Sequence, residues 1–502
     1  MTHPLKILIV AAEATPFIKT GGLADVAQAL PGALHRQGHD VRLALPCYGS
    51  IPASLKGTQR GTLFVNLDGT TQYGAWRETR LPDVDVPVYL IENDHYFWRD
   101  HPYSVNGYEY VDNLDRFCFF SRGVLDAVAQ TGWRPDVVHG NDWHTAPLIT
   151  YLNTHLANHT FWRGMPTVYT IHNLGYQGCY PKNLLPRTGL GWDLFHPDCL
   201  EFYGELNLMK GAIAFATKIN TVSRTYAREI QTPAYGLGLD GFLRTRKKDL
   251  TGIKNGIDYS LWNPQTDPHI TANYSPDKLA GKQRCKRAVQ DLADLPHRKD
   301  VPLFAIVTRL VWEKGIDLIV EAMDSFLRKG AQLVALGSGD PHLEVALETA
   351  GARWPDQVSV ILGYDEPLAH SIYAGADFFI MPSRSEPCGL TQMYSLAYGA
   401  IPIVRRTGGL ADTVTDLTPA NLAKGLATGL VFRPATAEAL TRATHRALRL
   451  YEDLKTLTAM RRAGMREDLS WERASAEYVA LYNDAIDATK KRYAATVDPA
   501  KW

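Results

Sequence analysis

The chain has 502 residues, of which 45% are hydrophobic and 21% are charged, as in ordinary globular proteins large enough for two or three domains. Its 53 basic residues balance its 53 acidic residues, so the formal net charge is zero. This balance argues against electrostatic capture by nucleic acid or a membrane, but it allows a local basic cleft for a phosphorylated small molecule.

The first apolar run, residues 5–12, is expected to form a β-strand. It is interrupted by Lys6 and is too short for a signal-peptide core or a transmembrane helix. The six cysteines are far apart and form no C-x-x-C pair, which fits a reducing compartment. We therefore expect a cytoplasmic protein.

Strand and helix signals alternate through the first half. After the strand at residues 6–10, apolar residues recur at helical spacing over 23–36, and a second strand follows at 41–45. The later runs are rich in β-branched residues and do not alternate with polar ones, as in buried parallel strands. These further strands are expected at 86–91, 136–139, 167–171 and 218–222.

The alternation restarts after residue 300, with helices such as 316–327 and 390–398 between strands. Alternating β and α elements predict parallel sheets with right-handed crossovers. The strands expected here are 303–308, 332–336, 358–362, 378–381, 401–404 and 430–432.

Two such runs predict an α/β chain of two doubly wound, Rossmann-like domains, with a ligand cleft at the carboxyl ends of the strands. We expect an N-terminal domain over residues 1–250 and a C-terminal domain over 251–466. Residues 255–280, rich in Gly, Pro, Asn and Asp, are expected to contain the hinge. The last segment, 467–502, is expected to form a helix that packs back on the first domain.

The hexapeptide TGGLAD occurs twice, at residues 20–25 and 407–412, each time after a strand and a cation, Lys19 or Arg406. A Gly-Gly pair lets the backbone approach a ligand, and a helix start presents N–H groups to an anion. The alternative is that the glycines only make a tight turn. Two such turns indicate two similar halves with a ligand between them.

Cations follow the strand at 303–308, where Arg309 and Lys314 lie on one loop. A diphosphate leaving group needs such charges where no metal is present, and two solvated surface cations are the alternative. The first glycine turn is not G-x-G-x-x-G, and no acidic residue ends the second strand. A nicotinamide-dependent dehydrogenase is therefore disfavoured.

The segment PSRSEPCGLT, residues 382–391, follows a buried strand and opens a helix. The amides of Gly389, Leu390 and Thr391 are expected to point at an anion. Glu386 is expected to bind sugar hydroxyls, and a helix-capping carboxylate is the alternative.

The segment DVVHGNDWHT, residues 136–145, also begins at a strand. His139, Asp142 and His144 do not have a recurrent zinc spacing, so no metal is expected. A carbohydrate surface is the better interpretation, because Trp143 offers a stacking face and its neighbours offer hydrogen bonds. His172 follows another strand and is part of the same candidate surface. The alternative for His172 is a purely structural role.

These motifs resemble those of bacterial glycogen synthases and plant starch synthases. The resemblance is carried by KTGGLAD, HGNDWHT, TIHNLGYQG, KNGIDYSLWNP, TRLVWEKG, PSRSEPCGLTQ and RRTGGLADTV, and it covers nearly the whole chain. It implies the GT-B architecture of two facing Rossmann-like domains and a retaining α-1,4-glucosyl transfer from a nucleotide sugar to a glucan end. Asn141 and Thr145 depart from the His and Ala that are common in this family.

The resemblance also implies roles for individual residues. Lys19, Arg309 and Lys314 would hold the donor diphosphate, His172 would orient the donor glucose, and Glu386 would bind its hydroxyls. The other donor-side residues are Gly21, Gly22, Asp25, Asn255, Tyr364 (stacked on the base), Cys388, Gly389, Leu390 and Thr391. The acceptor-side residues are Tyr103, Asp142, Trp143 and His144.

The motifs contain no clear carboxylate pair for a double displacement, so we favour departure and attack on the same face of the sugar. The leaving phosphate would take the acceptor's proton, its charge stabilised by the cations, and domain closure would exclude water. We expect ADP-glucose as donor in preference to UDP-glucose, a glucan such as glycogen as acceptor, and no metal cofactor, nucleic acid or membrane partner.

Three other functions fit parts of the pattern. A related retaining enzyme with a small acceptor, such as a sucrose- or trehalose-type synthase, would share the donor motifs. A glucan phosphorylase is weaker, because no pyridoxal-site pattern is found and the chain is short for that family. A non-catalytic glucan-binding module would not need the cations or Glu386.

Overall fold

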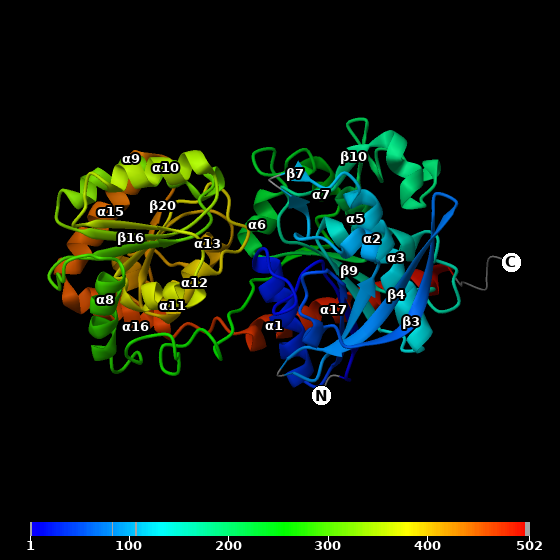
Figure 1. Cartoon of the computed structure of the whole chain (residues 1–502), viewed down its shortest axis with the longest axis horizontal. Helices are drawn as coiled ribbons and strands as arrows, with labels where there is room; N and C mark the ends of the chain where they lie inside the picture. The colour runs from blue at the N-terminus through cyan, green and yellow to red at the C-terminus, as the bar shows by residue number, and fades with distance from the viewer. Residues whose placement is uncertain (1–2, 83, 106–107, 497–502) are drawn as a thin grey trace. The chain divides into compact units, whose positions relative to one another are not determined.

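The structure is a computed structural model that describes residues 3–82, 84–105 and 108–496. The chain divides into two compact units, whose elements are labelled in Figure 1. The first unit contains the chain up to Val222, the stretch Ala227–Ile253, and the C-terminal segment from Trp471. The second contains Ser223–Tyr226 and Lys254–Ser470, which includes the segment in which the hinge was expected.

The first unit is built on one sheet with the strand order β14-β13-β9-β8-β1-β2-β5-β4-β3. The strands from β14 to β5 are parallel, whereas β4 is antiparallel to both its neighbours. The strands are β1 (Lys6–Val10), β2 (Asp40–Pro46), β3 (Thr58–Leu67), β4 (Thr70–Arg80), β5 (Pro87–Glu92), β8 (Val137–Asn141), β9 (Thr167–Ile171), β13 (Lys218–Thr221) and β14 (Leu250–Gly252).

Helices cover both faces of this sheet. The helices of this unit are α1 (Gly22–Arg36), α2 (Asp94–Phe97), α3 (Asn113–Thr131), α4 (Ala146–Asn153), α5 (Leu208–Phe215), α7 (Asp240–Thr245) and α17 (Trp471–Thr496), and α6 (Arg224–Glu229) begins in the stretch that belongs to the second unit. The C-terminal α17 packs on α1 and on β8, β9 and β13. Two buried tyrosines fix it there: Tyr478 lies 3.1 Å from Asn220 Nδ2, and Tyr482 lies 2.9 Å from His139 Nδ1.

Two small sheets complete the first unit. One pairs β10 (Cys179–Pro181), β12 (Glu205–Asn207) and β11 (Glu201–Phe202), and the other pairs β6 (Ser104–Val105) with β7 (Tyr108–Glu109).

The second unit has a parallel sheet with the order β17-β16-β15-β18-β19-β20. Its strands are β15 (Leu303–Val307), β16 (Gln332–Gly337), β17 (Val358–Leu362), β18 (Phe378–Met381), β19 (Ile401–Arg405) and β20 (Leu430–Phe432). Its helices are α8 (Ala280–Leu292), α9 (Ile316–Leu327), α10 (Pro341–Gly351), α11 (Glu366–Gly375), α12 (Thr391–Ala397), α13 (Gly408–Thr413), α14 (Pro419–Ala423), α15 (Ala437–Glu452) and α16 (Leu454–Met465).

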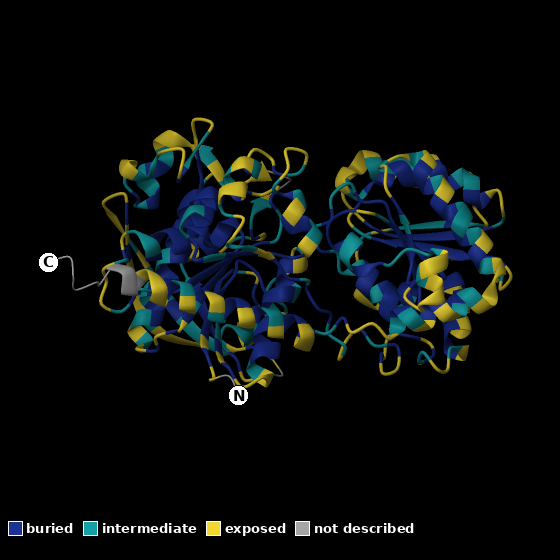
Figure 2. Ribbon diagram, turned by 180° about the vertical axis from the view of Figure 1, so that it is seen from behind, coloured by how far each residue is buried: buried dark blue, intermediate teal, exposed yellow. Residues whose placement is uncertain are grey.

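Within the second unit, α9 and α10 cover one face of the sheet, and α11 and α12 cover the other (Figure 1). The central strands are dark blue in Figure 2 because nearly all their residues are buried, while the outer helix faces are exposed. Burial on both faces explains why these strands are continuous apolar runs. Among the described residues, no helix is both long and apolar enough to cross a bilayer.

The prediction of two doubly wound α/β domains is confirmed, and the expected parallel strands are present within one or two residues. The β3–β4 hairpin was not predicted. Its turn is Asp68-Gly69, both at positive φ (52° and 68°), and its first strand alternates buried and exposed residues. This alternation is typical of a half-buried antiparallel edge.

The parallel part of each sheet reverses its strand order at one point. In the first unit the reversal lies between β1 and β8, and in the second it lies between β15 and β18. Loops at the carboxyl ends of strands on either side of such a point form the usual ligand site of an open α/β sheet. The loops after these four strands carry most of the predicted site residues.

Candidate active site

The first glycine turn, after β1, is organised by a carboxylate that the sequence analysis did not single out. Glu13 is buried, and its Oε2 accepts hydrogen bonds from Thr20 N (2.5 Å), Thr20 Oγ1 (2.8 Å) and Gly21 N (3.2 Å). Gly21 is the N-cap of α1 and has no side-chain cap of its own. The Gly21 amide, which was expected to meet a ligand, is therefore held by Glu13 together with the Thr20 amide, and Gly22 begins the helix beyond them.

Lys19 stands beside this turn and forms an ion pair with Asp25 in the first turn of α1, with 2.7 Å between Nζ and Oδ1. The side chains are 38% and 28% exposed, so a ligand phosphate has access to the ammonium group. Lys19, Gly21, Gly22 and Asp25, which the resemblance assigns to the donor side, thus lie together at this turn.

Asp142 and His172 meet at the ends of β8 and β9. Asp142 Oδ1 accepts the backbone N–H of His172 at 2.7 Å, and Asn141 Oδ1 lies 2.9 Å from His172 Nε2. Burial raises the pKa of Asp142 to about 7, against the effect of the His172 and Asn173 amides, and lowers that of His172 to about 3. His172 is therefore a neutral hydrogen-bonding group at neutral pH.

Tyr103, His144 and Trp143 form an aromatic cluster. The ring of Tyr103 stacks on His144, with centroids 4.6 Å apart, and its buried hydroxyl has no hydrogen-bond partner among the described residues. Trp143 is only 4% exposed, because Phe117 packs edge-on against it and Gly178 leaves room for its ring. The expectation of an open indole face is therefore wrong: Trp143 supports the cluster from inside.

His139 has a structural role. Its Nδ1 lies 2.9 Å from the Tyr482 hydroxyl and its Nε2 lies 2.6 Å from Thr170 Oγ1, so both ring nitrogens are occupied in the core. Burial lowers the pKa of His139 to about 3. Within the described part of the chain, no group of three or more His, Cys, Asp or Glu side chains is arranged to hold a metal ion.

The second unit brings Lys314 and Glu386 together from loops 72 residues apart. Lys314 Nζ lies 2.6 Å from Glu386 Oε2, which also accepts the Ser383 hydroxyl at 3.0 Å. Glu386 is 5% exposed, whereas Arg309 on the same loop as Lys314 is exposed and has no side-chain partner among the described residues. A carboxylate and two cations thus occupy the carboxyl ends of β15 and β18.

Arg384 connects these two loops, and the sequence analysis did not identify it. Its guanidinium binds both Asp317 oxygens (2.7 and 2.6 Å), donates to the Trp312 carbonyl and lies 4.1 Å from the Trp312 ring centroid. Gly315, at φ 71°, lets the turn approach Pro382, whose carbonyl oxygen would lie 2.7 Å from an added Cβ. This clamp joins the loop of Lys314 to the loop of Glu386.

The second TGGLAD copy packs against the Glu386 loop. Gly409 N donates to the carbonyls of Glu386 and Pro387, and an added Cβ would lie 1.8 Å from the Cys388 carbonyl oxygen. At Gly408, with φ 41°, it would lie 1.9 Å from that of Glu386. This copy therefore shapes the Glu386 loop. It fits the alternative in which the glycines only make a tight turn, and not the expected turn that meets a ligand.

Most of the other residues expected on the donor side lie at or just before the start of α12. Gly389, at φ 69°, leads through Leu390 into the helix at Thr391. Cys388 is buried, which raises the pKa of its thiol to about 12, and its sulfur accepts the backbone N–H of Asn255. The Asn255 Oδ1 atom is buried without a hydrogen-bond partner among the described residues. Tyr364 follows the edge strand β17 and is 63% exposed.

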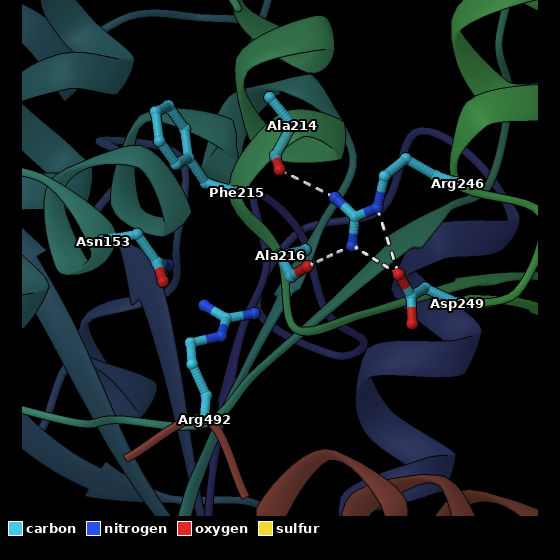
Figure 3. Close-up of a pocket in the computed structure, with 7 residues that line it drawn as sticks. All are labelled: Asn153, Ala214, Phe215, Ala216, Arg246, Asp249 and Arg492. Atoms are coloured by element: carbon cyan, nitrogen blue, oxygen red, sulfur yellow. Dashed lines mark hydrogen bonds and ion pairs between the residues drawn. The ribbon is translucent and has the colours of Figure 1, made fainter. Parts of the chain in front are cut away.

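A pocket of about 420 Å³ lies elsewhere on the first unit (Figure 3), and none of the predicted site residues lines it. Its Arg246 donates to the carbonyls of Ala214 and Ala216, both at 2.7 Å, and pairs with Asp249 at 3.1 Å. This guanidinium caps the end of α5, so its charge is already used within the fold.

Both halves of the chain match known protein families. Residues 6–245 match the starch synthase catalytic domain family, and residues 290–465 match the group 1 glycosyl transferases. A glycogen synthase of Geotalea daltonii is 46% identical over 480 residues, covering 95% of this chain and 98% of the relative. Glycogen synthase 1 of Methylococcus capsulatus is 45% identical over 493 residues, covering 96% and 97%.

Solved structures are similar as well. The catalytic domain of starch synthase IV from Arabidopsis thaliana, bound to ADP and acarbose, matches with a TM-score of 0.89 at 35% identity, over 96% of this chain and 100% of that one. A sucrose-phosphate synthase from Thermosynechococcus elongatus has a TM-score of 0.56 at 17% identity, over 96% and 99%, which shows a shared fold alone.

Proposed function

This chain is a glucosyltransferase of the glycogen synthase and starch synthase family, and we propose that it extends an α-1,4-glucan such as glycogen with glucose from ADP-glucose, retaining the anomeric configuration. The acceptor residues are assigned to the first unit and most of the nucleotide-sugar residues to the second, while Lys19 and His172 of the first unit are also assigned to the donor. The six cysteines are free, which supports a cytoplasmic location.

The observation that carries the donor assignment is the Lys314–Glu386 pair at the reversal point of the second sheet. A lysine there supplies charge for a diphosphate, and a buried carboxylate binds sugar hydroxyls. Arg309 adds an exposed guanidinium, which matches phosphate oxygens in a bidentate manner. Tyr364 offers an exposed ring for the base, and the unpaired Asn255 amide oxygen offers a further acceptor.

On the acceptor side we assign Asp142, Tyr103, His144 and Trp143, with His172 orienting the donor glucose. The unpaired Tyr103 hydroxyl supports this assignment, because a buried polar atom without a partner is costly unless a ligand satisfies it. Trp143 contributes by holding the stacked Tyr103 and His144 rings in place.

Transfer with retention then proceeds by departure and attack on the same face. The bond from the anomeric carbon to the phosphate oxygen breaks while the acceptor hydroxyl oxygen bonds to that carbon and its proton passes to the leaving phosphate. Arg309, Lys314 and Lys19 are assigned to stabilise the charge that develops on the diphosphate. His172, neutral at the working pH, serves as a hydrogen-bonding group and not as an acid.

The decisive assay combines the purified chain, a glycogen primer and labelled ADP-glucose or UDP-glucose, with and without EDTA. We expect incorporation that survives EDTA, and at least a tenfold preference for ADP-glucose in kcat/KM, or about 1.4 kcal/mol of transition-state binding. No incorporation from either donor would contradict the assignment. Inactivation by EDTA, reversed by one divalent ion, would overturn the metal-free mechanism.

Two variants test the donor residues. Lys314→Ala removes a charge stabiliser, so we expect kcat to fall about 10²–10³-fold with the fold intact. Glu386→Gln keeps the shape and is expected to lower kcat more than ADP affinity, because its proposed contact is to glucose. Transfer of glucose to a small acceptor, as in sucrose formation, but not to glycogen would favour the alternative of a related enzyme with a small acceptor.

A further inference from the structure

Glu13 is a buried carboxylate to which the mechanism above gives no role. It lies on the loop after β1, at the point where the first sheet reverses, and is 4% exposed. The three hydrogen bonds that it makes within the described residues go to one oxygen, Oε2, and come from Thr20 and Gly21. The carboxylate therefore occupies the position of an anion inside the glycine turn.

The simplest alternative is that Glu13 only stabilises the turn. Burying a carboxylate for that purpose is costly, because desolvation disfavours its charged form. Burial does raise the pKa of Glu13, with a further contribution from Asp25, although the Thr20 and Gly21 donors act in the opposite direction. A neutral capping side chain such as Ser or Asn would satisfy the same amides without this cost.

The position of the turn explains why a strong clamp is useful. Thr20 directly follows Lys19, and Gly21 directly precedes α1, whose first turn holds the Lys19 partner Asp25. A shift of Thr20 would move the lysine backbone and the helix start together. Three hydrogen bonds to Glu13 hold the side chain of Thr20 and the amides of Thr20 and Gly21.

We propose that Glu13 is a positioning residue for glucosyl transfer, which sets the location of Lys19 toward the donor diphosphate by clamping the Thr20–Gly21 turn. This inference rests on the proposed function, because it assumes that Lys19 acts on a nucleotide-sugar diphosphate. Glu13 itself touches neither donor nor acceptor in this role. A displacement of about 1 Å at a charge stabiliser is enough to cost about 10²-fold in rate.

A double-mutant cycle tests the proposal, with kcat/KM for ADP-glucose measured at saturating glycogen on the full chain. Glu13→Ala should lower kcat/KM about 100-fold when Lys19 is present. In the Lys19→Ala background the same change should cost less than about threefold, because a residue that acts through Lys19 has nothing left to position. The KM for glycogen should stay within about twofold throughout.

A matched control separates this role from turn stability. Glu201 Oε1 accepts the Gly204 amide at 2.7 Å, so Glu201→Ala also removes a turn-holding carboxylate from the first unit, outside the proposed site. We expect Glu201→Ala to keep kcat/KM within about twofold. If Glu13→Ala fails to fold, the isosteric Glu13→Gln replaces it, with an expected loss of about tenfold and the same dependence on Lys19.

The outcomes are distinguishable. Equal losses from Glu13→Ala with and without Lys19 would overturn the positioning role, and so would a lowered Tm with unchanged kcat per folded molecule. A wild-type chain that transfers no glucose from either donor would refute the proposed function itself, and the inference with it. If the wild type transfers glucose but the losses from Glu13→Ala and Lys19→Ala are additive, only the inference about Glu13 is overturned.

Discussion

The two TGGLAD copies have the same six residues, the same kind of preceding strand and a cation before each, yet they are used differently. In the first, Gly21 has open space around it, with the nearest neighbour of an added Cβ, Glu13 Oε1, 4.0 Å away. In the second, Gly408 and Gly409 lie directly against the backbone of residues 386–388. The first copy faces side chains and solvent, and the second faces a loop of its own unit.

The aspartates differ in the same way. Asp25 pairs with Lys19, one of the proposed donor residues, while Asp412 accepts the amide (2.8 Å) and hydroxyl (2.6 Å) of Thr225. Identical local sequence gives a strand-turn-helix unit in both places because the local rules are the same. What packs against the turn then decides whether it serves a ligand or another loop.

The largest expected difference separates Gly409→Ala from Gly21→Ala. A Cβ at Gly409 overlaps the Cys388 carbonyl, so the loop carrying Glu386 must shift, and we expect a loss of about 10³-fold or more in kcat together with a lower Tm. Gly21 has an extended backbone (φ −157°) that alanine adopts freely, so Tm should change little. Glucosyl transfer assays and thermal melts of both variants measure this contrast. If Gly409→Ala and Gly21→Ala lose the same amount of kcat, the two glycine turns do not differ as described.

The second contrast concerns the cation before each copy. Lys19→Ala should lower kcat about 10²–10³-fold, because it removes a proposed stabiliser of the leaving diphosphate. Arg406 is exposed, so Arg406→Ala should leave kcat within about twofold. Comparable effects on kcat/KM for ADP-glucose in the two variants would mean that the copies are functionally equivalent after all.

The third contrast concerns stability. Asp412→Ala removes the acceptor of two Thr225 hydrogen bonds and should reduce the free energy of unfolding by about 1–3 kcal/mol. Asp25→Asn breaks a partly exposed ion pair and should cost less than about 1 kcal/mol. Denaturant titration of both variants provides the comparison, and a larger loss from Asp25→Asn would reverse the assignment of the two aspartates.

The smallest expected effect is a pH dependence located in the first unit. Burial raises the pKa of Asp142 to about 7. Asp142, which accepts the His172 backbone N–H, therefore becomes ionised only as the pH rises through neutrality. We expect kcat/KM to increase about tenfold between pH 6 and 8, and Asp142→Asn to flatten this rise. The same raised pKa lowers the contribution of Asp142 to the free energy of unfolding as the pH rises from about 4 to 7. In this range the carboxyl group is ionised in the unfolded chain but still protonated in the folded protein. An unchanged pH profile in Asp142→Asn would assign the rise to another group.

Much of the fold was predictable because buried parallel strands are short apolar runs with clear turn signals. The strands β17, β18 and β20 were expected at their observed bounds. The β3–β4 hairpin was missed, since its half-buried alternation and its Asp-Gly turn are weaker signals than a continuous apolar run. Glu13 was missed for another reason: a single acidic residue in a loop has no pattern until its partners are known.

The sequence by itself determined the two α/β units, the strand-end loops that carry the proposed site residues, and the family to which the chain belongs. These follow from local periodicity and from motifs whose residues are adjacent in the chain. Only the tertiary structure decided that Lys314 meets Glu386, that Arg384 clamps their loops, that Trp143 is buried, and that one TGGLAD turn is held by Glu13 while the other is pressed against a neighbouring loop. The physical reason is that burial, pairing and steric fit depend on neighbours that are distant in the chain, and no local pattern specifies them.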